Sequence, residues 1–99
     1  MDDEQKLRFE QDRGHRAARI LEDEIFKDAI AAVKANAHDL FRAADSHDLD
    51  ALQVARVTLA CVEAVEKQIV HHMNTGKMAT TMLERIQAKI DFAKKRKAA

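Results

Sequence analysis

Apolar residues recur at alternating intervals of three and four through most of the chain, which is the spacing of one face of an amphipathic α-helix. The first run extends from about residue 16 to residue 44, and the second from about residue 48 to residue 73. A third, shorter run ends near residue 93. The pattern therefore predicts a long antiparallel helical hairpin with a shorter third helix that covers part of it.

Short polar residues and glycines mark the expected helix ends. The stretch from Asp45 to Asp48 separates the two long runs, and the Asp48 carboxylate is placed to accept from the first turn of the second helix. Asn74-Thr75-Gly76 suits the left-handed backbone of a helix C-cap, so we expect the second helix to end there. A capping-box pattern from Thr81 to Glu84 predicts where the third helix becomes strongly helical.

The composition narrows the fold class to all-α. The 99 residues include no proline, two glycines and no tryptophan or tyrosine, so turn-forming and strand-favouring residues are scarce. Hydrophobic residues make up 46% and charged residues 34%, as in a chain that folds. Within this single domain we expect a charged N-terminal arm over 1–15, interrupted by Gly14 and helical only in part or with a partner. A helical oligomerisation domain over 16–93 and a basic C-terminal tail over 94–99 follow.

No segment is typical of a membrane span or a signal peptide. The longest stretch without a charged residue, Gln68 to Gly76, is far shorter than the roughly 18 apolar residues that a span needs. The acidic start of the chain differs from a signal peptide. The lone Cys61 excludes an internal disulfide and fits a reducing compartment. We therefore expect a cytoplasmic protein with no membrane partner.

The short third helix leaves apolar surface on the hairpin, so we expect a homo-oligomer built as a helical bundle or ring. The second helix is apolar on more than one side, because Val54, Val57, Cys61 and Val65 line a side of their own. Glu66 interrupts the main stripe, and its carboxylate either reaches solvent at the edge or pairs across a subunit interface. The predicted interface consists of the main stripe: Phe26, Ile30, Val33, Leu40, Leu52, Leu59, Val62, Glu66, Ile69 and Met73.

Charge is balanced in total but not along the chain. Residues 1–60 hold thirteen acidic and nine basic side chains, whereas residues 61–99 hold four and eight. This asymmetry either orients head-to-tail contacts between subunits or holds the basic end against an acidic partner such as DNA. In the remaining interpretation, the basic residues complement the helix dipole and are otherwise solvated. A single copy would bind DNA weakly, but an oligomer would add many such ends. The candidate DNA-binding residues are Lys89, Lys94, Lys95, Arg96 and Lys97.

The pattern predicts no catalytic or metal site. Glu63 and Glu66 have no histidine three or four residues later, which is the spacing that helical metal sites use. Ser46 is typical of a turn, and Cys61 lies in the most apolar segment, where a thiol is normally an inert small hydrophobe. We therefore expect a protein that is not an enzyme and has no cofactor.

Four segments carry a resemblance to small helical proteins encoded near the packaging and head genes of tailed phages and prophages. They are the stretch from Arg13 to Ala18, the acidic stretch from Leu21 to Glu24, the central hairpin, and the stretch from Asn74 to Ala79. Among such proteins, the small terminase subunit has the function that fits this resemblance best. The resemblance covers most of the chain, but it includes neither a catalytic signature nor a recognisable N-terminal helix-turn-helix.

The resemblance implies a non-enzymatic, ring-forming assembly factor that recruits DNA and the packaging motor protein in the host-cell cytoplasm. Without a helix-turn-helix, the DNA contact that it implies is non-specific. The alternative is a small phage-encoded interaction or inhibitor protein that blocks a host protein through one face of the hairpin. The first hypothesis predicts an oligomer, whereas the second predicts a one-to-one complex and no need for DNA.

Overall fold

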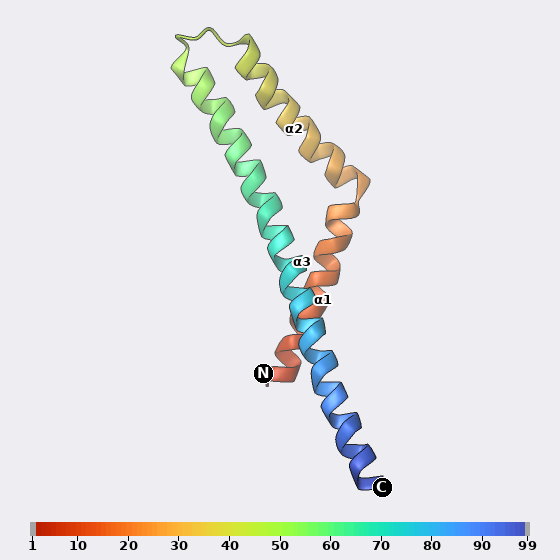
Figure 1. Ribbon diagram of the computed structural model, residues 1–99. Helices are drawn as coiled ribbons and strands as arrows, with labels where there is room; N and C mark the ends of the chain where they lie inside the picture. The colour runs from red at the N-terminus through yellow and green to blue at the C-terminus, as the bar shows by residue number, and fades with distance from the viewer. Residues whose placement is uncertain (1, 99) are drawn as a thin grey trace. The chain divides into compact units, whose positions relative to one another are not determined.

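The computed structural model describes residues 2–98 and contains three helices, α1 (Asp3–Glu22), α2 (Glu24–Ala43) and α3 (Leu49–Ala98) (Figure 1). Of the described residues, 93% are helical and none lies in a strand, so the all-α prediction is confirmed. Met1 of the predicted arm and Ala99 of the predicted tail lie outside these residues. The helices form two compact units. The hairpin unit comprises residues 19–70, and the crossing unit comprises residues up to 18 together with those from 71 onward.

The hairpin unit contains α2 and the first part of α3, which run antiparallel on either side of a short turn (Figure 1). At the end of α2, the Ala44 backbone N–H donates to the Leu40 carbonyl oxygen over 2.9 Å. At the start of α3, the Ala51 N–H donates to Asp48 Oδ1 over 3.1 Å. The turn and the capping role of Asp48 are thus confirmed.

The prediction of a single helix over residues 16–44 is wrong, because the helix is interrupted at Asp23. This residue is the N-cap of α2, with extended backbone at φ −66° and ψ 126°, and its Oδ1 accepts from the Phe26 N–H over 3.0 Å. The carboxylate satisfies a free donor of the first turn and makes a new helix start favourable. The apolar run continues across the break through Leu21, Ile25 and Ala29, which explains why periodicity alone misses it.

The predicted N-terminal arm forms most of α1, which begins at Asp3. Asp2 and Gln5 cap this start reciprocally: the Gln5 N–H donates to Asp2 Oδ1 over 2.7 Å, and the Asp2 N–H donates to Gln5 Oε1 over 3.2 Å. This exchange satisfies two backbone donors at the helix terminus. The arm also buries part of itself, since Gly14 and Ala17 are buried.

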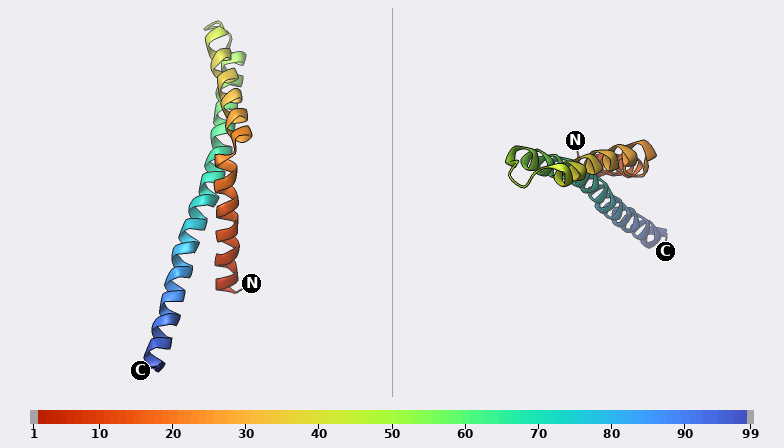
Figure 2. Two further views of the ribbon diagram at one scale, coloured as in Figure 1. Left: turned by 90° about the vertical axis from the view of Figure 1, so that its right-hand side faces the viewer. Right: turned by 90° about the horizontal axis from the view of Figure 1, so that it is seen from above.

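The predicted helix end at Asn74-Thr75-Gly76 is also wrong, because α3 continues through it without a break. In the crossing unit, α1 lies beside α3 (Figure 2), and the two helix backbones come close at Gly14 and Gly76. A Cβ atom added at Gly14 would lie 2.6 Å from the Gly76 Cα. No glycine of the described residues has a positive φ. Gly76 therefore serves the close approach of two helix backbones and does not form a cap.

The third predicted helix is consequently the second part of α3. Thr81, the expected capping residue, lies inside this helix, and its hydroxyl donates to the Lys77 carbonyl oxygen over 3.2 Å. Such a bond back to the preceding turn is the usual way for a threonine to satisfy its hydroxyl within a helix.

The interior consists of small residues. In the crossing unit, Ala17 and Ala79 are buried beside the two glycines, and in the hairpin unit the buried residues are Ala37 and Ala55. No large side chain among the described residues is fully buried. Small residues allow helices to pack closely, but each contributes little apolar area. Most of the large apolar side chains are therefore left half-buried or exposed.

Candidate functional site

One side of α3 in the hairpin unit presents apolar side chains that the rest of the unit leaves uncovered. Val54 is 57% exposed, Val57 is 47% exposed and Val65 is 51% exposed, and Cys61 between them is also exposed. Their spacing of three, four and four residues places them in one line along the helix. Around the helix axis, this line lies roughly a third of a turn away from the buried Ala55. We call these four residues the valine ridge. The ridge is the second apolar side that the sequence pattern indicates.

The neighbouring surface of α2 is also apolar or uncharged. A hollow of about 270 Å³ joins α2 to α3 beside the ridge, and Thr58, which lies between ridge residues along α3, lines it. Ile25, Ala29 and Ala32 continue this side of α2 and are exposed. We call this combined surface the uncharged face, and its members are Ile25, Ala29, Ala32, Val33, Asn36, Leu40, Val54, Val57, Thr58, Cys61 and Val65.

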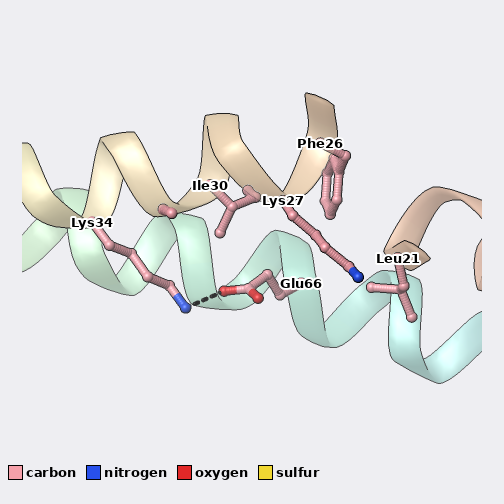
Figure 3. Close-up of a pocket in the computed structure, with 7 residues that line it drawn as sticks. Leu21, Phe26, Lys27, Ile30, Lys34 and Glu66 are labelled. Carbon is pink, nitrogen blue, oxygen red and sulfur yellow. Dashed lines mark ion pairs between the residues drawn. The ribbon is translucent and has the colours of Figure 1, made fainter. Parts of the chain in front are cut away.

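The other side of the hairpin unit carries charges. A hollow of about 260 Å³ is lined there by Lys27, Lys34 and Glu66 together with apolar residues (Figure 3). Lys34 projects from α2 and Glu66 from α3, and the Lys34 Nζ lies 2.6 Å from Glu66 Oε1. About a third of each side chain is exposed, so solvent screening limits this ion pair to roughly 1 kcal/mol or less. Glu66 thus pairs with a lysine of its own chain.

The predicted interface residues fall mostly between the helices of one chain. In the hairpin unit, all members of the predicted stripe are half-buried except Val33, which is 38% exposed. Met73 belongs to the crossing unit and is half-buried there. The stripe therefore supplies the contact within the hairpin, while the more exposed apolar residues lie beside it. The sequence does indicate these exposed residues, because no charge occurs along the ridge or at positions 25, 29, 32, 33, 36 and 40.

The crossing unit holds a small polar cluster beside the glycine contact. The Arg13 Nη2 lies 3.3 Å from His72 Nε2, and since arginine can only donate, the histidine nitrogen accepts. Glu10, His71 and Thr75 complete the lining of a hollow of about 190 Å³. On the other flank, Gln11 Nε2 donates to Thr80 Oγ1 over 2.9 Å. These polar contacts orient α1 on α3. Within residues 2–98, no three His, Cys, Asp or Glu side chains gather as a metal site would require.

The candidate DNA-binding residues all lie near the end of α3. Lys89, Lys94, Lys95, Arg96 and Lys97 are exposed, and the last three occupy the final turn. The helix thus continues through the positively charged segment to Ala98. Basic side chains at a helix C-terminus stabilise it through the dipole, and the same exposed charges remain accessible to a polyanion.

Comparison of the chain with family models, characterised proteins and solved structures finds no match. Within residues 2–98, none of the helices has an apolar stretch long enough to cross a membrane.

Proposed function

We propose that the protein is a non-catalytic assembly factor that forms a homo-oligomer through the uncharged face of its hairpin unit. The observation that carries this proposal is the lack of large buried side chains: the buried apolar residues are Ala17, Ala37, Ala55 and Ala79. A chain with 46% hydrophobic residues gains most of its folding free energy by removing such residues from water. A second chain on the uncharged face would provide the burial that one chain lacks.

The exposed surface supports this proposal quantitatively. The chain exposes 7900 Å². A compact monomer of this mass would expose about 5,700 Å², and even two separate compact units of half the mass would expose only about 6,900 Å². The excess over the larger figure is about 1,000 Å², which is comparable to the roughly 800 Å² that each partner buries in a stable interface. Part of this excess lies outside the uncharged face, for example at Met78 and Phe92, which are 68% and 64% exposed.

The resemblance to small terminase subunits extends the proposal to phage DNA packaging. In this role the oligomer brings together the basic ends of α3 from at least two copies, and these ends hold the DNA backbone without sequence preference. The same assembly would present its acidic N-terminal half to the packaging motor protein. The exposed basic residues of α3 support the DNA contact, since no side chain of their own chain pairs with Lys94, Lys95, Arg96 or Lys97 in the described residues.

Light scattering coupled to size-exclusion chromatography, at low and high salt, tests the oligomer. We expect a mass of at least twice 11.2 kDa under both conditions, because an apolar interface is not weakened by salt. A single-chain mass at both salt concentrations would contradict the proposal, and it would favour the hypothesis of a monomeric inhibitor that blocks a host protein.

Replacing Lys94, Lys95, Arg96 and Lys97 by alanine should weaken non-specific binding to duplex DNA and leave the oligomer mass unchanged. Each phosphate contact that is lost reduces the magnitude of the slope of log affinity against log salt by roughly 0.9, so four lost contacts reduce it by as much as about 3.6 per chain. Fluorescence anisotropy across a salt series measures the affinity and this slope. The matched control removes four cations from the hairpin unit: Lys27, Arg42, Arg56 and Lys67. If both variants lose the same affinity, the binding depends on net charge and not on the end of α3.

A further inference from the structure

We propose that two copies of the chain pair in parallel, so that the valine ridge of each lies on the α2 surface of the other, around a two-fold axis that runs along the hairpins. This inference rests on the proposed function and defines the interface that it requires. The occupant of the uncharged face is a second copy of the same chain, because this face carries both the valine ridge and an α2 surface of small residues, and these two parts complement each other when two copies meet.

The distribution of charge in the hairpin unit favours a two-fold arrangement. A head-to-tail contact would need two different complementary patches, whereas a two-fold contact uses one patch on both copies. The side opposite the uncharged face carries Lys27, Lys34 and Glu66 around its hollow. Burying that side under another chain would remove charged groups from water at a cost of several kcal/mol for each ion. Only the uncharged face can be covered without this cost.

The shapes of the two helices favour ridge against groove. On α3 the exposed residues are branched valines, each about half exposed. On α2 the central residues of the face are Ala29, Ala32 and Asn36, which are exposed but small or slender. Packing is densest when large side chains on one surface meet small ones on the other. Ridge against ridge would place valines on valines and leave the two alanine surfaces apart.

The register of this contact follows from the register within one hairpin. In the hollow beside the ridge, Thr58 lies level with Val33 and Asn36. Cys61 follows Thr58 by three residues along α3. Because α2 runs in the opposite direction, the residue of α2 at the level of Cys61 lies about three residues before the level of Thr58, near Ala32. A two-fold axis parallel to the helices preserves this level and places α3 of one copy over α2 of the other. Cys61 of one copy therefore faces Ala32 of the second copy.

Oxidative crosslinking of the full chain tests the arrangement. In the Ala32→Cys variant with Cys61 retained, mild oxidation should shift the chain to twice its mass on a non-reducing gel, because the two thiols lie across the interface. The unsubstituted chain should stay largely at single mass, since the two Cys61 residues are held apart. The matched control is Ala35→Cys, an exposed position of α2 outside the uncharged face, which should crosslink no more than the unsubstituted chain. Adding Cys61→Ala to Ala32→Cys should abolish the linked dimer.

Each other outcome is informative. Efficient crosslinking of the unsubstituted chain would mean that α3 of one copy lies on α3 of the other, and it would overturn the proposed arrangement. A bridge at single-chain mass, or equal crosslinking of the Ala32→Cys and Ala35→Cys variants, would also overturn it. Light scattering on the same samples separates the two proposals: an oligomer without the expected crosslink contradicts only this arrangement, whereas a monomer contradicts the proposed function as well.

Discussion

Replacing Gly14 by alanine is expected to detach α1 from α3 in the crossing unit and to lower the free energy of unfolding by about 1 to 3 kcal/mol. The added Cβ would lie 2.6 Å from the Gly76 Cα and 3.2 Å from the His72 carbonyl oxygen. Both neighbours are backbone atoms, so no flexible side chain can move aside. The helices must separate instead, and the buried contacts of Ala17 and Ala79 weaken with them.

Helix propensity acts against the steric conflict in this variant. Alanine favours a helix over glycine by about 1 kcal/mol at an interior position. If the steric conflict were absent, the variant would therefore be more stable than the unsubstituted chain. The pair Lys6→Gly and Lys6→Ala, compared at one exposed position of the same helix, measures the difference in propensity alone. Thermal denaturation by circular dichroism gives the stability, and hydrogen exchange over residues 3–18 shows whether α1 has detached. A stabilised Gly14→Ala variant would show that the glycine contact is not close in solution.

Replacing Val57 and Val65 together by glutamate is expected to convert the oligomer to single chains while leaving its helices intact. The two valines are 47% and 51% exposed in one chain, so that chain tolerates charges at both positions. In the oligomer the same carboxylates would be buried without a partner, at a cost of several kcal/mol for each. The loss of affinity should therefore exceed about 100-fold, which corresponds to roughly 2.7 kcal/mol.

The control for this variant adds two carboxylates to the same helix but away from the valine ridge. Gln53→Glu with Ala60→Glu meets this requirement, because both residues are exposed and helical spacing places them outside the ridge. Light scattering should report single-chain mass for the ridge variant and an unchanged oligomer for the control. Dissociation of both variants would indicate that added negative charge, and not burial of the ridge, separates the chains.

Much of the fold follows from apolar periodicity. The all-α class, the turn near Asp45 and the cap at Asp48 can all be predicted, because each depends on a local signal. The break at Asp23 could not be predicted from the pattern, since one apolar stripe runs through it and Phe26 stands where a capping box would have a glutamate. The continuity of α3 through Gly76 depends on a contact with Gly14, sixty-two positions earlier in the chain, which no local pattern contains.

The candidate surface could be predicted only in part. Periodicity identifies both apolar stripes of the second helix, but it does not show which of them α2 covers. The structure buries Ala55 against α2 and leaves Val54 and Val57 exposed. The partner of Glu66 could not be predicted either, because Lys34 is thirty-two positions away on another helix and spacing along one helix cannot identify it. Both features depend on which side of each helix faces the other helix, and this orientation is a property of the tertiary structure.

The small buried residues also determine where this chain can change during evolution. An added Cβ at Gly14 or Gly76 would meet backbone atoms, and Ala17, Ala37, Ala55 and Ala79 are buried, so we expect these six positions to favour the smallest residues. Large apolar positions are only half-buried and accept many exchanges of similar polarity. Distant relatives would then share few identical residues apart from these six. Their kinship would be visible as a spacing of small residues, even where ordinary sequence similarity has been lost.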